Sequence, residues 1–557
     1  MTAEPVAGPV GIVGAGPVGL VLAARLASFG VQSVLFERDP ELIRQGSKAC
    51  LIQGDALEVL DKIGCAQEVD DEGVTWTVGH TYVRNTEIRR DVYPDRVGFG
   101  AFVNISQFRI EQIVLARVEQ DQLCDVRWAH TVSSVEQDDD GVTVAVSTPD
   151  GDREFRCSHL VACDGVRSGL RESLGVRLTG YTHKDRFLIT DIKAVLPLAK
   201  ERHFHYDPSF NPGRQLVMHP QPDDVWRIDW QLPPDADIDA ERTNGDFDRR
   251  VRQVIGDDVD YEIDWVSTYR FHQRVVETFK VGRVLLAGDA AHALPPYGSR
   301  GMNSGIQDAD NLAWKLAHVL RSGGHDRLLA SYDVERHAAA RENLRITEAT
   351  IRFMVPPNAL RRMARSLLLA VSRRSRRAQG MVNSGRMAEP FTYRVSPIVD
   401  EQWEHPLRGA FAPDCAIGSG RLRRAFGNGF VVLIRADDAE QRSRFVAAVL
   451  ASTSLTPADM VVVVAEGPGH AVGVMARPAA STGVTTVTAE LDAFDDLYRI
   501  TEPTWFLVRP DGHIAAGGAV ATPDLVAAAL ARATGAGPGL ADLGRVEPGR
   551  TYQEAPN

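Results

Sequence analysis

Three motifs built from glycine and aspartate carry the residue types that hold an anionic cofactor. The first, Gly14-Ala15-Gly16-Pro17-Val18-Gly19, directly follows an apolar run and precedes a segment rich in Leu and Ala. Gly14 allows a tight turn, Gly16 lets the backbone approach a pyrophosphate, and Gly19 lets a helix pack against a strand. Glu37 ends the next apolar run, where a carboxylate can accept ribose hydroxyls. The pattern predicts a dinucleotide site but does not separate FAD from NAD.

The second and third motifs also follow apolar runs that read as buried strands. Cys163-Asp164-Gly165 leads into a short segment that reaches Arg171, and Gly288-Asp289 leads into a loop rich in Pro and Gly. A long amphipathic pattern then starts near Asn303. A strand, a loop and a helix N-terminus together expose backbone amides to a negatively charged group. The third motif therefore predicts an anion held over the start of this helix.

The elements that position these motifs follow an α/β pattern. Strands are predicted at residues 10–13 and 33–36 around a helix that ends near residue 30, which is the Rossmann-like arrangement. Residues 75–103 are predicted to form a small antiparallel insert. Three further strands are predicted at residues 126–135, 141–147 and 154–157.

A second sheet is predicted between the second and third motifs. Its strands at residues 187–193, 214–219, 225–231 and 265–271 would cover the cofactor with one face toward a substrate. His272 is a candidate general base, with packing against a neighbouring Arg as the alternative. The candidate lining residues are His203, His205, Tyr206, Met218, Trp226, Trp230, Tyr269 and His272, and strand aromatics of this kind also serve as core.

A separate α/β pattern begins at about residue 405, after predicted helices at 320–395 and a candidate linker at 381–410. Its predicted strands lie at residues 430–434, 460–465 and 505–508, and its predicted helices at 439–451 and 525–533. It contains no C-x-x-C motif and Cys415 stands alone, so we expect packing or dimerisation rather than disulfide exchange.

Composition narrows the class of protein. The chain has 557 residues and a net charge of −12, which argues against a general nucleic-acid binder. No apolar run is long enough to span a bilayer, no secretory signal is visible, and the six cysteines are scattered as in a reducing cytoplasm. Arginines from 361 to 377 surround Leu367-Leu368-Leu369; such a helix can touch a membrane, but we expect a solvated or subunit-facing helix. We predict a cytoplasmic protein without nucleic-acid or membrane partners, with a homodimer as a candidate assembly.

In order and spacing, the three motifs resemble those of the single-component, class A flavoprotein aromatic hydroxylases. This group includes the p-hydroxybenzoate, phenol and 3-(3-hydroxyphenyl)propionate hydroxylases, and the resemblance covers residues 10 to about 345. It implies an α/β fold, with an FAD-binding Rossmann-like domain (residues 1–178 and 276–395) and an inserted β-sheet substrate domain (residues 179–275). Residues 405–535 look like the thioredoxin-like domain of the larger members, and residues 536–557 would be a flexible tail.

The resemblance also implies which residues bind FAD. Asp164 would serve FAD and the passing nicotinamide cofactor, and Asp289 would bind the ribityl or pyrophosphate region. Lys48 stands where many relatives have Arg, and Cys50 stands about where phenol hydroxylase has an active-site aspartate. The implied FAD contacts are Gly14, Gly16, Gly19, Glu37, Arg38, Lys48, Gln107, Asp164, Asp289, Gly301, Met302 and Asn303.

The reaction that the resemblance implies is hydroxylation of an aromatic ring. NADH or NADPH would reduce FAD, and reduced FAD would react with O2 to give a C4a-hydroperoxide that transfers oxygen to a phenolic or related substrate. Pro295 would lie beside the flavin where oxygen reacts, and His272 and Tyr297 are the other candidate catalytic residues. Because the chain has a single glycine-rich dinucleotide motif, the nicotinamide cofactor would bind transiently in a groove.

Three alternatives stay open. The first keeps the chemistry but makes the enzyme a tailoring hydroxylase of a polycyclic aromatic natural product. The second is a flavin dehydrogenase or halogenase, although the W-x-W-x-I-P signature of related halogenases is absent from the sequence. The third is a non-catalytic FAD redox sensor, against which the presence of Asp164, Asp289 and Pro295 argues weakly.

Overall fold

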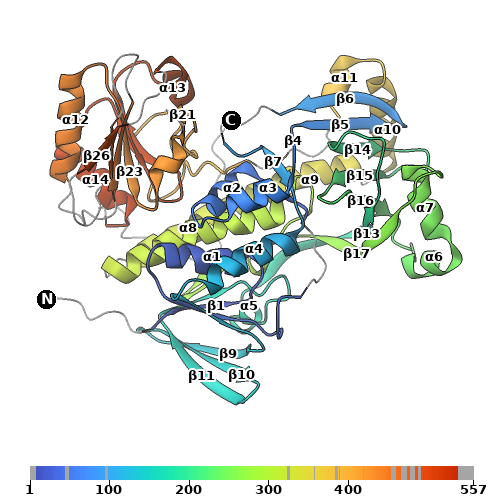
Figure 1. The fold of residues 1–557 in the computed structure, drawn as a ribbon, viewed down its shortest axis with the longest axis horizontal. Coiled ribbons are helices and arrows are strands. Elements are labelled where there is room, and N and C mark those ends of the chain that lie inside the picture. Colours follow the sequence, from blue (N-terminus) through green and yellow to red (C-terminus); the bar gives the residue numbers. More distant parts are fainter. Residues whose placement is uncertain are drawn as a thin grey trace.

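The computed structural model resolves the chain into three neighbouring regions. It describes residues 8–43, 49–93, 98–322, 326–356, 358–382, 387, 389–417, 420–452, 460–465, 473–476, 483–486 and 491–536. Lys48 and the tail beyond residue 536 lie outside the described residues. Figure 1 shows the N-terminal sheet with its helices near the centre, a second sheet (green and blue) on one side, and the C-terminal sheet (orange to red) on the other.

The first sheet is the mostly parallel sheet that the glycine motifs predict. Its strand order is β18-β19-β12-β1-β2-β8, and β1 pairs in parallel with β2 and β12. A helix packs against this sheet, and so does the antiparallel strand at residues 151–157, whose Phe155 ring lies 5.2 Å from the ring of Phe36. Strands β1, β2 and β12 are therefore buried along their whole length. The strands are β1 (Val10–Val13), β2 (Ser33–Phe36), β8 (Cys124–Arg127), β12 (His159–Ala162), β18 (Lys280–Val281) and β19 (Val284–Leu286).

Two helices hold the first and third motifs against each other. Helix α1 (Pro17–Ser28) starts inside the first motif, and helix α8 (Arg300–Ser322) follows the third. A Cβ atom added at Gly305 would lie 2.5 Å from Cγ2 of Val18, so only glycine permits this approach of α8 to α1. The smaller helices of this region are α2 (Gly54–Asp61), α3 (Ala66–Glu72), α4 (Gln107–Glu119) and α5 (Gly169–Ser173).

The second sheet is eight-stranded, with the order β20-β17-β13-β16-β15-β14-β5-β6. It contains the four predicted substrate strands, and helices α6 (Ile238–Asn244) and α7 (Asp246–Ile255) pack beside it. Its strands are β5 (Val78–Val83), β6 (Thr86–Val92), β13 (Leu178–Lys193), β14 (Arg202–Tyr206), β15 (Gln215–Pro220), β16 (Val225–Leu232), β17 (Glu262–Val276) and β20 (His292–Ala293).

The predicted insert at residues 75–103 is not a separate unit. Its hairpin β5–β6 is antiparallel as expected, but β5 pairs in parallel with β14 and so extends the second sheet. Strands β4 (Val74–Trp76) and β7 (Phe102–Asn104) instead form a small sheet with β3 (Leu51–Gln53). The pairing of β5 with β14 gives hydrogen-bond partners to the edge of β14, which would otherwise expose unpaired backbone groups.

The predicted strand at residues 126–135 is two strands. β8 ends at Arg127, a turn with Ala129 at φ 55° follows, and β9 (Thr131–Gln137) begins a different sheet. That sheet has the order β11-β10-β9, with β10 (Val142–Thr148) and β11 (Gly151–Cys157) joined as a hairpin. The two strands belong to different sheets because the chain reverses at the turn.

Three helices lead to the C-terminal sheet, whose order is β26-β25-β24-β23-β27-β28. In the part of the chain that the structure describes, no helix combines the length and the apolar composition that crossing a bilayer requires. The three helices that lead to the C-terminal sheet are α9 (Asp326–Met354), α10 (Ala359–Ser372) and α11 (Arg376–Gly380). The C-terminal elements are β23 (Phe430–Arg435), α12 (Ala439–Ser452), β24 (Met460–Ala465), β25 (Gly473–Ala476), β26 (Gly483–Thr486), α13 (Leu491–Tyr498), β27 (Thr504–Val508), β28 (Ile514–Gly518) and α14 (Pro523–Ala533).

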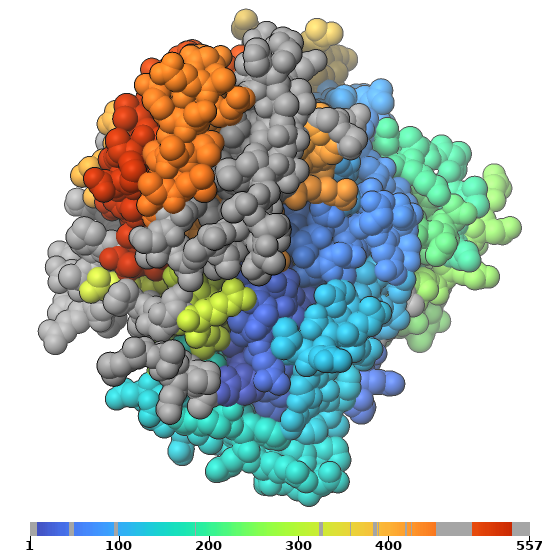
Figure 2. Space-filling view, turned by 60° about the vertical axis from the view of Figure 1, so that its left-hand side comes forward, coloured from blue at the N-terminus to red at the C-terminus, as the bar shows by residue number. Residues whose placement is uncertain are grey.

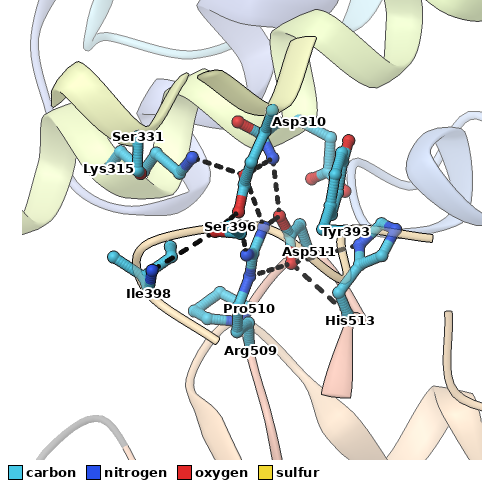
Figure 3. Close-up of polar contacts among 12 residues, drawn as sticks. Asp310, Lys315, Ser331, Tyr393, Ser396, Ile398, Arg509, Pro510, Asp511 and His513 are labelled. Atoms are coloured by element: carbon cyan, nitrogen blue, oxygen red, sulfur yellow. Dashed lines mark hydrogen bonds and ion pairs between the residues drawn. The ribbon is translucent and has the colours of Figure 1, made fainter. Parts of the chain in front are cut away.

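A buried ionic network joins the C-terminal region to the long helices. Arg509, in the turn between β27 and β28, forms ion pairs with Glu335 of α9 and with Asp511. Lys315 of α8 lies 2.7 Å from the same Glu335 carboxylate, and all four side chains are buried. Figure 3 shows Lys315 on one side and Arg509 and Asp511 on the other, converging from the two regions. Because each charged group is buried away from water, the cost of its burial is offset only by the oppositely charged groups beside it.

Arg509→Met should lower the free energy of unfolding by about 3 kcal/mol, because it leaves Glu335 and Asp511 buried with one fewer positive partner. Urea unfolding followed by fluorescence measures the change. Arg424→Met is the matched control, since it breaks a half-exposed contact with Asp61 between the same two regions. The control should cost about 1 kcal/mol or less. Equal losses for the two variants would contradict the network's role.

The pH dependence gives a second check of the same network. Burial would raise the pKa of Glu335, but Arg509 and Lys315 outweigh it and lower that pKa below its ordinary value. A lowered carboxyl pKa gives stability above the unfolded-state pKa that is lost as pH falls through the folded-state pKa. The advantage of the wild type over Arg509→Met should therefore shrink as the pH falls below the ordinary glutamate range.

Candidate functional site

The first motif forms an open cradle at the start of α1. Gly14 has φ +106°, and a Cβ there would lie 2.5 Å from the carbonyl oxygen of Cys163. A Cβ at Gly19 would lie 2.0 Å from the oxygen of Gly14, whereas a Cβ at Gly16 would meet nothing within 4 Å. Two glycines are thus required by packing inside the protein, and the third faces open space where a ligand can approach.

Glu37 is fixed against this cradle. Its Oε2 accepts a hydrogen bond of 2.7 Å from the backbone N–H of Ala15, and its Oε1 accepts one of 3.0 Å from Asp39. The carboxylate therefore ties the end of β2 to the first motif. Arg38, which follows it, is exposed.

The second motif places a buried carboxylate with spare bonding capacity beside the first. Oδ2 of Asp164 accepts from Leu170 N–H at 3.3 Å, while its Oδ1 is buried without a partner among the described residues. Burial raises the pKa of this carboxyl. Arg171 donates to the carbonyl of Ala290 at 3.3 Å, which joins the second motif to the third. An orphaned buried acceptor of this kind calls for a ligand donor or water.

The third motif is held by Asp308, a buried residue of α8. Its Oδ2 accepts from Gly288 N–H at 2.9 Å and lies 2.8 Å from Nε2 of His292, while Arg336 binds Oδ1. Burial would raise the pKa of Asp308, but Arg336 and His292 outweigh it and keep the pKa low. With its neighbours held in this way, Asp289 projects to the exposed side.

The start of α8 combines a fixed side chain with free backbone amides. Asn303 accepts from Gln53 N–H at 2.9 Å and donates to the carbonyls of Leu51 and Ser299. Its side chain therefore holds the neighbouring loops together rather than facing open space. A Cβ at Gly301 would meet nothing within 4 Å, so the first-turn amides there remain accessible.

Three other predicted residues of this site lie at its border. Gln107, at the start of α4, accepts from Ala49 N–H at 3.4 Å and donates to Glu111 at 2.9 Å. Met302 is buried beneath the start of α8. Pro295 is buried in the loop between β20 and α8.

This donor set fits FAD. The N-termini of α1 and α8 offer amides to anionic groups, Gly16 and Gly301 leave room for the backbone to approach them, and Asp164 offers an unused buried acceptor. Pairing between β1 and β12 and between β12 and β19 brings the three motifs to the same edge of one sheet. Ligands of open α/β sheets bind at this edge, beyond the carboxyl ends of the strands.

The two faces of the second sheet differ chemically, as the alternating side chains of β16 show. Trp226 and Trp230 lie in an apolar cluster with residues of α6 and α7, and Met218 of β15 lies in the same cluster. Arg227 and Asp229, which alternate with the tryptophans, project from the opposite face. These three predicted lining residues therefore lie in the core beneath α6 and α7.

Tyr297, from the loop after the third motif, identifies the face that meets the cofactor region. Its hydroxyl accepts from Nε2 of Gln215 at 2.6 Å. Its ring centroid lies 5.2 Å from that of Phe271 and 6.3 Å from that of Phe187. The ring centroid of Tyr269 lies 5.1 Å from that of Phe271, so this predicted lining residue lies on this face.

His272 belongs to the other side of β17. Its Nδ1 lies 3.0 Å from Oγ1 of Thr182, and Arg274 donates to the same hydroxyl at 2.9 Å. Neighbouring side chains of a strand alternate between faces, so His272 projects away from the face that carries Phe271. The packed arrangement with Arg, expected as the alternative, is the one that the structure contains.

The histidines predicted on β14 and the tyrosine predicted there lie on opposite faces of the strand. The ring of His203 lies 4.9 Å from that of His80, and the ring of His205 lies 4.5 Å from that of Tyr82. Tyr206 is buried in an apolar cluster that includes Phe204. These side chains pack where β14 meets the hairpin β5–β6.

Sequence reasoning missed the polar residues on the face toward Tyr297. Arg227 binds Asp191 through two hydrogen bonds of 2.7 Å, and both side chains are buried. Burial raises the pKa of Asp229 to about 7. The positive charge of the nearby Arg227 lowers this pKa but only partly offsets the effect of burial. The period-two alternation of residues 225–231 could have identified this face, since it separates Arg and Asp from the tryptophans.

Comparison with known proteins identifies the family of the chain. Residues 8–347 match the family model described as FAD binding domain. A 3-(3-hydroxy-phenyl)propionate/3-hydroxycinnamic acid hydroxylase of Burkholderia cenocepacia is 30% identical over 422 residues, which cover 74% of this chain and 76% of that protein. A 12-dehydrotetracycline 5-monooxygenase/anhydrotetracycline 6-monooxygenase of Streptomyces rimosus is 30% identical over 420 residues, which cover 72% of this chain and 79% of that protein.

Solved structures share the fold over nearly the whole chain. The flavin-dependent monooxygenase PieE, in complex with FAD and substrate, superposes with a TM-score of 0.78 at 22% identity, covering 96% of this chain and 100% of that one. Aklavinone-11 hydroxylase with FAD and aklavinone gives 0.73 at 24% identity, covering 95% and 99%. The chain belongs to the class A family of FAD-binding flavoprotein monooxygenases and is an FAD-dependent aromatic hydroxylase.

Proposed function

We propose that this enzyme uses NAD(P)H and O2 to hydroxylate an uncharged phenolic ring, the class that includes polycyclic aromatics. The observation that carries the proposal is the face around Tyr297, where Phe187, Phe271 and Tyr269 supply aromatic surface. Arg227, a buried cation of that face, is already bound by Asp191, and the buried Arg202 lies over the ring of Phe204. An aromatic acid would need a cation for its carboxylate, whereas a neutral ring needs stacking surface.

The relatives act on both kinds of molecule. One is named for hydroxyphenylpropionate and hydroxycinnamic acid, which carry a carboxylate, and another for tetracycline intermediates, which are polycyclic. The paired state of Arg227 favours the second kind.

Bound FAD would supply hydride acceptance and oxygen activation. The first motif and the Gly301 amides would bind the cofactor, with Asp164 and Asp289 as polar contacts on either side. The N-terminus of α8 would stabilise negative charge on the cofactor. Pro295 and the aromatic rings near Tyr297 would exclude water and orient the substrate ring.

We infer a thioredoxin-like fold for residues 405–535 and a structural role for them. Strand β23 pairs in parallel with β24 and antiparallel with β27, and β27 pairs antiparallel with β28. The region has no C-x-x-C motif, and burial raises the pKa of Cys415 to about 11, so thiol chemistry is not favoured. Its contacts through Arg509 support a packing role.

A matched substrate pair tests the charge argument. The holoenzyme should oxidise NADH or NADPH faster with the methyl ester of 3-(3-hydroxyphenyl)propionate than with the free acid, because the ester removes the charge and keeps the ring. Mass spectrometry should show one added oxygen atom in the product. A panel of polycyclic phenols extends the test. If no aromatic stimulates oxidation, the hydroxylase proposal fails; if the acid is preferred, only the substrate class fails.

Asp289→Ala should weaken FAD binding by about tenfold or more, because the variant removes one polar contact to a charged cofactor. Flavin content after gel filtration and fluorescence titration with FAD measure the loss. Asp333→Ala is not a suitable comparison, since Asp333 caps Phe279 N–H. Asp125→Ala, on the exposed side of β8, is the control and should retain FAD. Full occupancy in Asp289→Ala would refute the assignment.

Asp229 is the candidate proton acceptor for the substrate hydroxyl. Its Oδ1 is buried without a partner among the described residues, and its pKa is raised to about 7 by burial. A base must be deprotonated to act, so kcat/KM should rise as the pH increases through about 7.

Asp229→Asn should remove that rise and lower kcat/KM by about 100-fold at neutral pH. Flavin content and the circular dichroism spectrum should stay as in the wild type. Gln231→Glu, on the same face of β16, controls for a general change of charge. An unchanged pH profile in Asp229→Asn would eliminate this residue as the base.

A further inference from the structure

Helix α10 has an apolar stripe on its outer face in addition to the face that it buries. Leu360, Met363, Leu367 and Val371 are spaced three and four residues apart, so they share one side of the helix. Leu360 is 70% exposed, Met363 65% and Leu367 66%. A surface helix normally turns charged residues outward, so a continuous exposed apolar stripe indicates a binding surface.

The inner face of α10 is already occupied. Leu369 is buried in a cluster with Phe204 and Tyr206 of the second sheet. Arg365 donates to the carbonyls of Met354 and Gly213. The outer stripe is therefore not part of the core of this chain.

The stripe lies within a segment of one charge sign. Residues 349–388 contain neither Asp nor Glu, although the whole chain has a net charge of −12. The arginines of this segment are Arg352, Arg361, Arg362, Arg365, Arg373, Arg374, Arg376, Arg377 and Arg386. The six at 361, 362, 373, 374, 376 and 377 are exposed. The surface pairs an apolar stripe with positive charge around it.

The position of α10 leaves this surface accessible. Figure 1 shows α10 and α11 at the outer edge of the molecule, beside β5 and β6 and far from the C-terminal sheet. Figure 2 shows the C-terminal region (orange to red) and the second sheet (green) on opposite sides of the N-terminal part (blue).

The positive charge around the α10 stripe indicates which class of partner would bind this surface. A second copy that paired α10 with α10 would place arginines against arginines, which is unfavourable. Protein hot spots are rich in Trp, Tyr and Arg in desolvated pockets, whereas this stripe is Leu, Met and Val on the outside of one helix. An interfacial membrane helix combines such a stripe with flanking basic residues.

We propose that the surface formed by α10 and α11 binds anionic phospholipid bilayers peripherally. The stripe from Leu360 to Val371 would enter the boundary between head groups and acyl chains, and the exposed arginines would contact lipid phosphates. The alternatives expected from the sequence, a solvated helix and a subunit-facing helix, are separated from this proposal by the test below. The inference is independent of the hydroxylation chemistry.

Vesicle flotation with the FAD-loaded enzyme tests the proposal. The wild type should float with vesicles of phosphatidylcholine and phosphatidylglycerol but not with phosphatidylcholine alone. Binding to the anionic vesicles should weaken as salt increases. The assay needs no substrate turnover, so its outcome is separate from the test of the proposed function.

Two variants separate the contributions. Arg361→Glu/Arg362→Glu should lower the lipid partition coefficient by about tenfold or more, since each basic residue near the surface contributes. Glu is tolerated in the first turn of α10, so the helix should remain folded. Met363→Gln/Leu367→Gln should also lower the lipid partition coefficient by about tenfold, because the variant removes apolar area that the bilayer would bury. Glutamine is a good helix former, so α10 should remain folded.

Matched controls should bind as the wild type does. Arg153→Glu/Arg249→Glu makes the same change in net charge at exposed sites on β11 and α7. Leu525→Gln removes an exposed apolar residue on α14. Flavin content should be unchanged in every variant.

Three outcomes would overturn the proposal. They are no flotation of the wild type, equal flotation of the α10 variants and the wild type, and equal loss in the control variants. Light scattering adds a fourth: if the α10 variants convert a lipid-free dimer to a monomer, a second copy covers this surface instead.

Discussion

The buried carboxylate of Asp308 is the interaction on which the cofactor region depends. It accepts from Gly288 N–H, contacts His292 and is bound by Arg336 of α9, so one side chain holds the third motif against two long helices. A buried carboxylate is costly unless it is fully paired, and here each partner also fixes a backbone segment. The arrangement gives the loop that carries Asp289 a single position.

The same logic extends to the C-terminal region. Arg336 donates to the hydroxyl of Tyr393 at 2.7 Å, and the guanidinium of Arg509 lies 5.3 Å from the Tyr393 ring. Arg509 in turn pairs with Glu335, the neighbour of Arg336 on α9. A continuous set of buried polar contacts thus runs from the cofactor loop to the turn between β27 and β28, and Figure 3 shows the end of it at Tyr393, Arg509 and Asp511. The C-terminal region thus completes the charge balance of the helices that position the cofactor loop.

Much of the cofactor region is local and was predictable from residue types. β1 and β2 have the predicted bounds, and α1 begins within the first motif, because glycine spacing and apolar runs determine these elements over a few residues. The long helix after the third motif was predicted for the same reason, and its buried stripe includes Ile306, Ala309 and Leu316. The sequence could not show that Oδ1 of Asp164 is buried without a hydrogen-bond partner among the described residues, because this depends on which donors the fold places around it.

By itself, the sequence determined the cofactor class and the order of the elements, because a glycine cradle and its strand and helix are encoded within one short segment. Only the tertiary structure decided the rest. It put Trp226 and Trp230 beneath α6 and α7, turned Arg227 and Asp229 toward Tyr297, and joined β5 to β14. It also brought Arg509 to Glu335, 174 residues earlier in the chain. These choices depend on which distant surfaces bury apolar area and pair charge together, and no local pattern specifies that.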